Sequence, residues 1–550
     1  MPERVLVCVA WPYANYLLHV GQAAGAYLPA DIFARYHRLK GNDVLMVSGS
    51  DSHGTPITVA ADKEGVSPQA IVDRYHARIV EVWERFGISF DLYTTTLTEN
   101  HYATTQDVFR KLRENDLLYP RTEEYLFDPE ANRFLPDRYV EGTCPNCGYG
   151  EARGDQCDNC GKTLDAVELI NPKSKISGAT PVLKPSEHYF LRLSAMEDRL
   201  KEWAGKQAHW RRNVLNFTLG MLNEGLKDRA ITRDIAWGVP VPVDGYEDKR
   251  IYVWFDAVIG YLSASKEWAQ SRGEPDAWKP FWEDPTVRSY YFIGKDNIPF
   301  HTVIWPMMLM GYGGLNVPYD VPANQYVNFT ATQKQSKSKG TGNWMVDLLD
   351  SYDPDVLRFY LTTVLPETND TEFREEDLIR ANNDVLIATW GNLANRVISM
   401  IHRNFDGVVP GVTELSPESE TILGEARAAF ENVGREFEAC HFRGGLQEAL
   451  KLAQAGNKYL DERAPWKAVK TDLPHAAETL ATALNVINAL KQLLHPVLPF
   501  STVQLHESLG LPGSLRDVGW AYNPVPAGTS LGPTTPLYTK IEPELAGASA

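Results

Sequence analysis

Apolar and polar positions alternate in a regular way over the first 117 residues. Residues 5–10 and 43–48 are near-continuous apolar runs that predict strands, and residues 25–39 between them predict a helix. Strands that are apolar along their whole length and alternate with helices are typical of a parallel sheet covered on both faces. The same rhythm returns over residues 246–325. The pattern therefore predicts a doubly wound α/β domain in two halves.

Three further regions depart from this rhythm. Residues 118–245 hold loops, a cysteine cluster and short mixed strands, which predicts an insertion between the two halves. Residues 381–520 predict a helical bundle, because their apolar residues recur at steps of three and four with short connections. Residues 521–550 are rich in Pro, Gly and Thr and predict an extended tail. One helical face of the bundle is formed by Leu386, Trp390, Leu393, Val397 and Ile401.

Composition and charge narrow the class of protein. A chain of 550 residues predicts three or four domains, and 43% hydrophobic with 23% charged residues is typical of a soluble globular protein. The N-terminus has no secretory signal pattern, and no apolar stretch is long enough to span a bilayer. We therefore expect a cytoplasmic protein with no membrane partner. The net charge of −17 argues against a DNA-coating protein but allows an RNA partner at a local patch.

Four of the six cysteines form two CxxC pairs, Cys144-x2-Cys147-x9-Cys157-x2-Cys160. Two such pairs at short separation predict a structural zinc site with four thiolate ligands and no open position for catalysis. A redox pair or disulfides would be the alternative, and neither suits a cytoplasmic insertion. Cys8 and Cys440 lie on a predicted strand and helix, and we expect both to be buried.

Two polar segments have residue types suited to phosphate. His19-Val20-Gly21-Gln22 follows the first predicted strand, where a histidine can donate a hydrogen bond and glycine allows close backbone approach. Lys334-Gln335-Ser336-Lys337-Ser338 carries lysines that can neutralise charge building on phosphoryl oxygens. Taken singly, each segment is better explained as an ordinary polar loop.

Together, the two segments resemble a known family. Residues 19–22 resemble the HIGH signature of class I aminoacyl-tRNA synthetases, and residues 334–338 resemble their KMSKS loop. "AWPYAN", "RFLPDRYVEGTCPNCG", "FIGKDNIPFHTVIWP" and "ERAPWK" resemble the methionyl-tRNA synthetases in particular. The resemblance implies a Rossmann-type sheet, a zinc-knuckle insertion, a KMSKS-loop stem-contact subdomain over residues 326–380 and an α-helical anticodon-binding bundle. It also implies ATP-dependent activation of L-methionine, with Mg²⁺, and its transfer to the 3' end of tRNA(Met).

The resemblance also implies roles for individual residues. Asp51 takes the methionine ammonium group, and the remaining pocket residues are Trp11, Tyr13, Trp254, Ala257, Val258, Tyr261 and His301. Phosphate binding and catalysis fall to His19, Gly21, Gln22, Lys334 and Lys337. The adenosine contacts are Gly294 and Asp296. The residues that read the CAU anticodon are Asn392, Arg396 and Trp466.

Two positions depart from the family pattern. Gln22 stands where a second histidine is frequent, and an amide can still donate a neutral hydrogen bond. Tyr16 stands where glycine is usual, so its side chain must point out of the ATP site.

One alternative is a synthetase for isoleucine, valine or leucine, which carries a much larger editing insertion. Another is a catalytically weak paralogue that binds tRNA or regulates. Because the chain ends without an additional C-terminal RNA-binding barrel, we expect a monomer.

Overall fold

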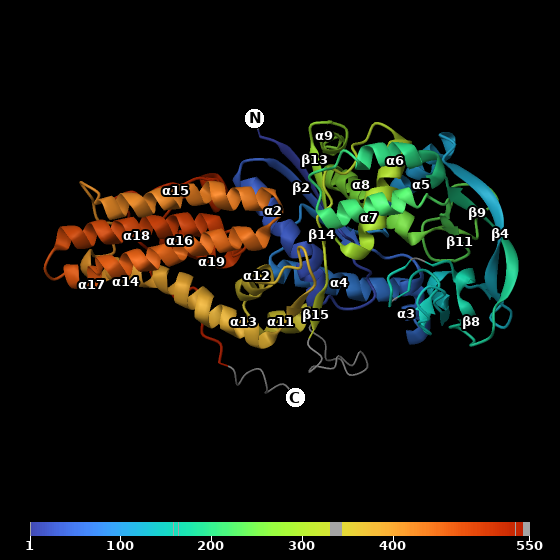
Figure 1. Ribbon diagram of the computed structural model, residues 1–550, viewed down its shortest axis with the longest axis horizontal. Helices are drawn as coiled ribbons and strands as arrows, with labels where there is room; N and C mark the ends of the chain where they lie inside the picture. Colours follow the sequence, from blue (N-terminus) through green and yellow to red (C-terminus); the bar gives the residue numbers. More distant parts are fainter. Residues whose placement is uncertain (1, 158, 163, 330–343, 534, 543–550) are drawn as a thin grey trace.

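The parallel sheet lies between two extensions of the molecule (Figure 1). A helical bundle extends to one side of the sheet, and the cysteine-containing insertion covers the other end. The structure is a computed structural model, and it describes residues 2–157, 159–162, 164–329, 344–533 and 535–542. None of the helices in these ranges has the length and apolar character needed to cross a membrane.

The described residues form a five-stranded parallel sheet with the order β14-β13-β1-β2-β3. Its strands are β1 (Arg4–Val9), β2 (Asp43–Ser50), β3 (Leu92–Thr95), β13 (Arg288–Gly294) and β14 (Ala323–Asn324). The predicted doubly wound parallel sheet is therefore confirmed. The chain returns after the insertion to place β13 beside β1, so the order of the strands reverses at this pair.

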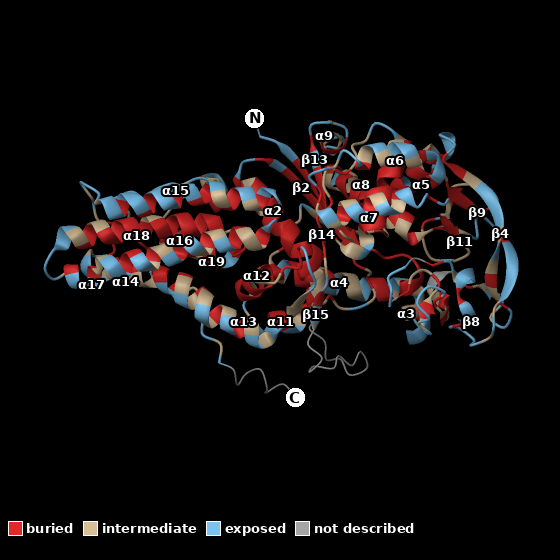
Figure 2. Ribbon diagram, viewed as in Figure 1, coloured by how far each residue is buried: buried red, intermediate tan, exposed pale blue. Residues whose placement is uncertain are grey.

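Side chains of β1 alternate between two buried cores, as expected for a strand covered on both faces. Val5, Val7 and Val9 enter the core that continues into the bundle, whereas Leu6 and Cys8 enter the core on the other face. Figure 2 shows buried residues in the strands of the sheet and along the helices of the bundle. The first face is covered by α2 (Leu28–Leu39), and the second by α5 (Glu99–Glu114) and α8 (Val253–Ser271).

The helix predicted over residues 25–39 begins differently from the prediction. A single turn, α1 (Val20–Gln22), is followed by a π-helix, η1 (Ala23–Tyr27), and only then by α2. A second π-helix, η6 (Phe300–Ile304), precedes α10 (Trp305–Tyr312). π-Helical turns are frequent near functional sites, and these two follow β1 and β13, the central strands of the sheet.

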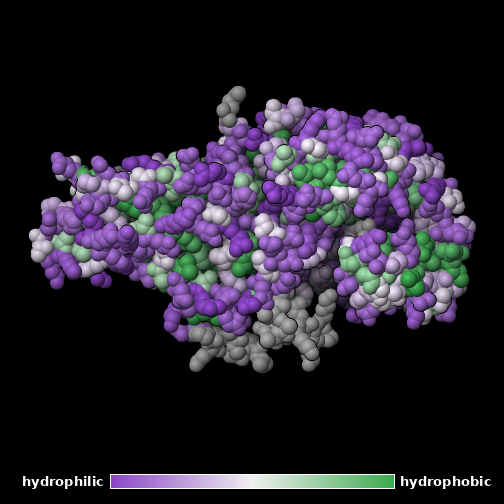
Figure 3. Space-filling view, viewed as in Figure 1, coloured by the Kyte–Doolittle hydropathy of each residue, from purple (hydrophilic) through white to green (hydrophobic). Residues whose placement is uncertain are grey.

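The insertion consists of a long ribbon and a small separate core. β4 (Leu118–Asp128) and β9 (Val182–Leu191) pair antiparallel along most of their length. The cysteine knuckle, residues 139–174, includes β6 (Val140–Thr143) and β8 (Ile170–Ser174). Figure 3 shows an apolar area on this end of the molecule. The exposed large apolar residues there are Val167, Ile170, Ile176, Val182 and Leu183.

The bundle is built from η7 (Ala381–Gly391), α14 (Asn392–Asn404), α15 (Pro417–Glu438), α16 (Phe442–Arg463) and α18 (Leu473–Leu494). The predicted apolar face from Leu386 to Ile401 is buried, as expected. That face runs over a π-helix and an α-helix rather than one α-helix. Cys8 and Cys440 are buried, which confirms their predicted environment, although Cys440 lies beyond the end of α15.

The bundle is attached to the sheet through α12 (Pro354–Thr363). Arg358 on α12 is fully buried and donates to the Asp31 carboxylate of α2 at 2.6 Å. The same guanidinium donates to the carbonyls of Pro496 at 2.9 Å and Val497 at 2.8 Å, in the bundle. One buried cation therefore joins the two regions.

The remaining elements are shorter or flank the main layers. The helices are α3 (Thr55–Glu64), α4 (Pro68–Phe86), α6 (Glu197–Ala204), α7 (Arg212–Asn223), α9 (Lys279–Trp282), α11 (Met345–Ser351), α13 (Glu375–Arg380), α17 (Pro465–Ala468), α19 (Pro499–Ser508) and α20 (Leu515–Val518). The 3₁₀ turns are η2 (Asp137–Tyr139), η3 (Ala166–Glu168), η4 (Leu193–Met196) and η5 (Lys295–Asn297). The short strands are β5 (Arg133–Phe134), β7 (Ala152–Arg153), β10 (Arg229–Ala230), β11 (Thr232–Arg233), β12 (Arg250–Ile251), β15 (Val327–Phe329) and β16 (Thr371–Phe373).

Candidate active site and metal centre

The predicted site residues gather beyond the carboxyl ends of the central strands. Trp11 and His19 follow β1, Asp51 follows β2, and Gly294 ends β13. In open parallel sheets, ligands bind in the crevice that forms where the strand order reverses. The pair of β1 and β13 is that point in this chain.

The segment after β1 places His19 directly over a glycine. A Cβ atom added to Gly21 would lie 3.0 Å from His19 Nδ1 and 3.1 Å from its Cε1, so a larger residue at position 21 would displace the imidazole. The Gln22 side-chain oxygen accepts a hydrogen bond from the His19 backbone N–H at 3.0 Å. Because this bond uses the oxygen of the amide, the Gln22 NH₂ group keeps its capacity to donate.

Lys334 and Lys337 lie outside the described residues, but both flanks of their segment are described. Before this segment, the Val327 carbonyl oxygen lies 3.8 Å from the point where a Cβ atom added to Gly21 would be placed. After it, Trp344 forms a β-bridge with His19, and the Met345 N–H donates to the Leu18 carbonyl at 2.8 Å. The two flanks thus contact the turn that holds His19. Tyr16 is exposed, and its ring packs against Trp344.

Asp51 is held by backbone contacts and is almost fully buried. Its N–H donates to the Pro12 carbonyl at 2.8 Å, and its carbonyl accepts from the Ala14 N–H at 2.9 Å. Burial and the charge of Asp256 raise the pKa of Asp51 well above its ordinary value. No ion pair joins Asp51 to a cationic side chain in the described ranges. An ammonium ligand is the partner that this buried carboxylate would favour.

The residues expected to line the methionine pocket include hydrogen-bonded aromatic side chains next to Asp51. Trp254 Nε1 donates to Tyr13 Oη at 2.5 Å, and Tyr261 Oη lies 2.8 Å from His301 Nε2. His301 Nδ1 donates to the Asn297 carbonyl at 2.9 Å, and burial lowers the pKa of His301 to about 4. His301 is therefore neutral at pH 7, and its Nε2 accepts the Tyr261 hydroxyl. An uncharged polar wall of this kind suits an uncharged side chain.

Trp11 fits this pocket only because two neighbouring residues have no side chain. A Cβ on Gly49 would lie 2.4 Å from the Trp11 ring, and a Cβ on Gly260 would lie 2.7 Å from it. The Trp11 ring meets the Tyr261 ring edge-on. The neighbouring predicted residues on α8 differ in exposure, since Val258 is buried whereas Ala257 is half-buried. Gly49 and Gly260, which make room for the Trp11 ring, were not identified from the sequence.

A buried polar network lies beneath the pocket and was also missed. Asp256 on α8 accepts from His53 Nδ1 at 2.6 Å through one oxygen, and its other oxygen contacts His101 Nε2. The Trp11 ring lies against the His101 ring. These three groups could in principle ligate a metal, but their atoms sit at hydrogen-bonding distance, and we assign them a supporting role. The sequence signal was only that His53 is two residues from Asp51.

At the β13 end, the Asp296 carboxylate is exposed and accepts a hydrogen bond from the Tyr326 hydroxyl. The Lys295 ammonium lies 3.9 Å from the centre of the Tyr326 ring and 2.9 Å from Asp370. Tyr326 was not predicted as a site residue. An aromatic residue shortly before a lysine-rich loop has no distinctive spacing, so only the fold identifies it as a neighbour of Asp296.

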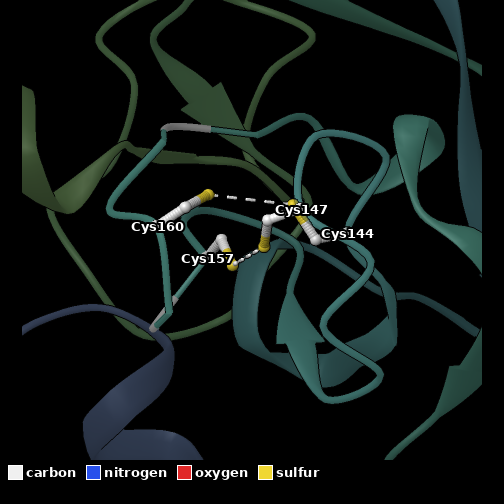
Figure 4. A group of neighbouring side chains, drawn as sticks. All are labelled: Cys144, Cys147, Cys157 and Cys160. Carbon is white, nitrogen blue, oxygen red and sulfur yellow. Dashed lines mark hydrogen bonds between the residues drawn. The ribbon is translucent and has the colours of Figure 1, made fainter.

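Two equivalent turns bring the four predicted cysteines together (Figure 4). In the first turn, the Cys144 carbonyl accepts from the Gly148 N–H at 3.0 Å, and in the second the Cys157 carbonyl accepts from the Gly161 N–H at 2.9 Å. Each glycine follows the second cysteine of its pair and has a positive φ, 75° and 69° respectively, which glycine adopts at little cost. The sequence CxxCG therefore encodes the same turn twice.

The four sulfur atoms lie within 4.8 Å of one another. Cys144 and Cys160 are 4.0 Å apart, and Cys147 and Cys157 are 3.6 Å apart. These separations exclude disulfides and agree with the value of about 3.8 Å expected for thiolates around tetrahedral zinc. The Lys162 N–H and the Asn146 amide lower the pKa of Cys160 to about 6, which favours a thiolate. The cluster could therefore hold a metal ion.

A surface cavity of about 540 Å³, the α14 pocket, lies at the far end of the bundle. It is lined by Asn395, Arg396, Ser399, Met400, Arg403, Asn404, Trp466 and Val469. The Arg396 guanidinium lies 5.2 Å from the Trp466 ring centre and pairs with Asp461 at 3.1 Å. The structure thus brings Arg396 and Trp466 together. Asn392 is exposed one turn earlier on α14 and does not line the cavity.

Family profiles match nearly the whole chain. The profile described as tRNA synthetases class I (M) matches residues 5–398, and the profile described as the anticodon binding domain of methionyl tRNA ligase matches residues 409–547. Trp466 lies in the region matched by the anticodon-binding profile. Every other predicted site residue lies within residues 5–398, matched by the synthetase profile, so the two profiles together cover the whole predicted site.

Individual relatives agree with the profiles. The chain is 53% identical over 542 residues to the methionine–tRNA ligase of Dehalococcoides mccartyi, covering 98% of each protein. It is 48% identical over 570 residues to that of Thermomicrobium roseum, covering 98% of this chain and 97% of the relative. A crystal structure of Mycobacterium tuberculosis methionyl-tRNA synthetase bound by methionyl-adenylate superposes with a TM-score of 0.81 at 26% identity, covering 98% of this chain and all of that one. These findings do not support the alternative of a catalytically weak paralogue that binds tRNA or regulates. The chain belongs to the methionyl-tRNA synthetase family of class I aminoacyl-tRNA synthetases.

Proposed function

We propose that this protein activates L-methionine with ATP and transfers it to the 3' end of tRNA(Met). The similarity to methionine–tRNA ligases over 98% of the chain carries this proposal. It is supported by the convergence of His19, Asp51 and Asp296 at the carboxyl ends of three neighbouring strands. The proposal covers both initiation and elongation of translation.

Methionine binds beside Asp51 in the proposed complex. The buried carboxylate pairs with the ammonium group, and this pairing compensates the cost of burying Asp51 without a cation. The thioether lies among the rings of Trp11, Tyr13, Trp254 and Tyr261, against His301, Ala257 and Val258. Sulfur–aromatic contacts contribute about 0.3–1.5 kcal/mol each. Because His301 is neutral, the part of the pocket that holds the thioether offers no charge to a competitor with a charged side chain.

In the first step, a methionine carboxylate oxygen bonds to the α-phosphorus of ATP, and the bond from that phosphorus to the bridging oxygen of pyrophosphate breaks. His19 and the Gln22 NH₂ group donate hydrogen bonds to phosphate oxygens. Lys337 and Lys334 neutralise the charge that develops on the departing pyrophosphate. Mg²⁺, bound mainly by the phosphates and water, supplies further charge neutralisation. Gly294 allows adenosine to approach the backbone, and Asp296 accepts from the ribose hydroxyls.

In the second step, a hydroxyl oxygen of the terminal tRNA ribose bonds to the methionyl carbonyl carbon, and AMP leaves with the pair of electrons of the mixed-anhydride bond. The enzyme chiefly positions the reactants in this step. At the far end of the tRNA, the CAU anticodon binds around Arg396 and Trp466, with Asn392 at the margin. Stacking of one base on Trp466 is worth about 1–3 kcal/mol.

The proposed function also includes expectations about the zinc site, the oligomeric state, the location and the domain boundaries. Zn²⁺ bound by Cys144, Cys147, Cys157 and Cys160 serves structure, because four protein ligands leave no open coordination position. The protein acts as a monomer in the cytoplasm and binds neither DNA nor membranes. We retain the expected division into residues 1–117, 118–245, 246–325, 326–380, 381–520 and 521–550.

Aminoacylation tests the proposal. The protein is incubated with ATP, Mg²⁺, a tRNA(Met) transcript and each amino acid in turn, and acid-stable charging of the tRNA is measured. We expect charging with methionine alone. Charging with isoleucine, valine or leucine would contradict the proposal. A failure to charge the tRNA with any amino acid would also contradict it. A control transcript with an altered anticodon measures how far recognition depends on the α14 pocket.

A further inference from the structure

We propose that Arg211 is a positioning residue that couples the α14 pocket to the turn that holds His19. Arg211 lies immediately before α7, in the insertion, and its side chain reaches three other segments. Nη1 donates to the Ala323 carbonyl at 3.1 Å, to Asn324 Oδ1 at 2.7 Å and to the Glu367 carbonyl at 3.2 Å. Nη2 donates to the Cys440 carbonyl at 2.9 Å, in the bundle.

Asn324 connects this guanidinium to the catalytic turn. Its side-chain oxygen accepts from Arg211, and its NH₂ group donates to the Gly25 carbonyl at 2.8 Å. The two bonds fix the orientation of the amide, which is 1% exposed. Gly25 lies within η1, the π-helix that directly continues from Gln22. A displacement of Arg211 would therefore shift Asn324 and η1, and with them the adjoining residues proposed to contact the ATP phosphates.

Helix α16 connects the same guanidinium to the α14 pocket. Cys440 belongs to the tight turn before α16 and has a φ of 56°. Beside it, the Arg443 N–H donates to the Glu367 carboxylate at 3.1 Å. α16 then runs for 22 residues, a span of about 33 Å. Near its far end Asp461 pairs with Arg396, and Trp466 follows two residues after Ala464, the residue that ends the helix.

The chemistry of arginine suits this position. One planar guanidinium donates to oxygens from the catalytic sheet, the segment before β16 and the bundle at once, whereas a lysine ammonium could not match this fixed arrangement. α16 is one continuous helix that begins beside the Arg211 contact and ends beside the α14 pocket, so a shift at one end can be passed to the other. A tRNA bound at the pocket thereby favours one position of η1 during methionine transfer. This inference rests on the proposed function.

Arg211→Gln and Arg211→Lys test the proposal, with Lys40→Gln as the matched control. Lys40 pairs with Glu438, the last residue of α15, across the same joint between sheet and bundle, and this pair includes no residue of α16 and not Asn324. For each variant we measure methionine-dependent ATP–pyrophosphate exchange without tRNA. We also measure kcat and KM for aminoacylation of tRNA with the CAU anticodon and of a transcript with one anticodon base replaced.

We expect the exchange rate of Arg211→Gln to stay within about threefold of the wild type, while its preference for the CAU transcript falls by roughly tenfold, mainly in kcat. Arg211→Lys should recover part of the preference, and Lys40→Gln should retain it. An unchanged preference in Arg211→Gln, or equal losses in exchange and in charging of both transcripts, would overturn the proposal. Absence of exchange in the wild type would instead contradict the proposed function.

Discussion

The proposed methionine pocket and the cysteine knuckle reach their rigid geometry by different means. The pocket stands on a parallel sheet with a large core on each face, and its polar groups are held by neighbours such as Asn297 and Asp256. The knuckle has a separate small core, in which two of the buried residues are themselves cysteines, Cys144 and Cys157. Packing can fix the first region without a ligand, whereas the second has too little apolar surface to do so.

The largest effect is expected from removing Cys157, one of the four proposed zinc ligands. Cys157→Ser should abolish stoichiometric zinc binding and disorder the knuckle, because structural zinc sites supply roughly 10–16 kcal/mol of binding free energy. The sheet and its pocket should stay folded. Metal analysis and amide hydrogen exchange measure the two parts of this prediction. Slow exchange throughout the knuckle of the metal-free variant would show that packing suffices there. Cys8→Ser is the control, since Cys8 lies in the sheet core.

The stability of the sheet and bundle should depend instead on the buried ion pair between Arg358 and Asp31. Arg358→Ala leaves the Asp31 carboxylate buried with one cationic partner fewer, so we expect a loss of about 3–5 kcal/mol in the free energy of unfolding. Denaturant unfolding measures it, and zinc content should not change. A loss below about 1 kcal/mol would mean that the joint between sheet and bundle is held by other contacts. Arg4→Ala, which removes a half-exposed pair with Asp43, is the control and should cost under about 1 kcal/mol.

Proton binding distinguishes Asp51 from His301 within the pocket. The raised pKa of Asp51 means that the carboxylate becomes neutral at a higher pH than an ordinary aspartate, so the KM for methionine should rise as the pH falls through that pKa. The rise should approach about tenfold per pH unit. His301, with a pKa of about 4, stays neutral over this range and contributes nothing to it. Kinetics against pH test this, and Asp51→Asn should remove the dependence.

The smallest effect concerns the α14 pocket, which is neither a packed core nor a metal site. Trp466 is 39% exposed, so Trp466→Ala should leave the free energy of unfolding nearly unchanged. It should weaken binding of tRNA(Met) by about 1–3 kcal/mol, the value of one lost base stack. Equilibrium binding of the transcript measures this, and Phe500→Ala, another exposed aromatic, serves as the control. Equal affinity of the two variants would place the anticodon elsewhere.

Local signals identified much of this architecture. The apolar runs predicted β1 and β2, and the CxxC spacing predicted which sulfur atoms converge, because both depend on residues close together in the chain. The long-range partners were not predictable. Gly49 and Gly260 make room for Trp11, and Arg211 meets Cys440, across separations that no periodicity reports. The π-helix of residues 23–27 was also missed, since its apolar residues fit an α-helix equally well.

Methionine-dependent ATP–pyrophosphate exchange tests the central claim most directly, because it isolates the activation step from tRNA. The wild type and Lys337→Ala are assayed with a panel of amino acids. We expect exchange with methionine alone, and a decrease of about 10²–10³-fold in the variant, the effect of losing one preorganised charge-stabilising group. No exchange from folded, zinc-loaded wild type would contradict the account.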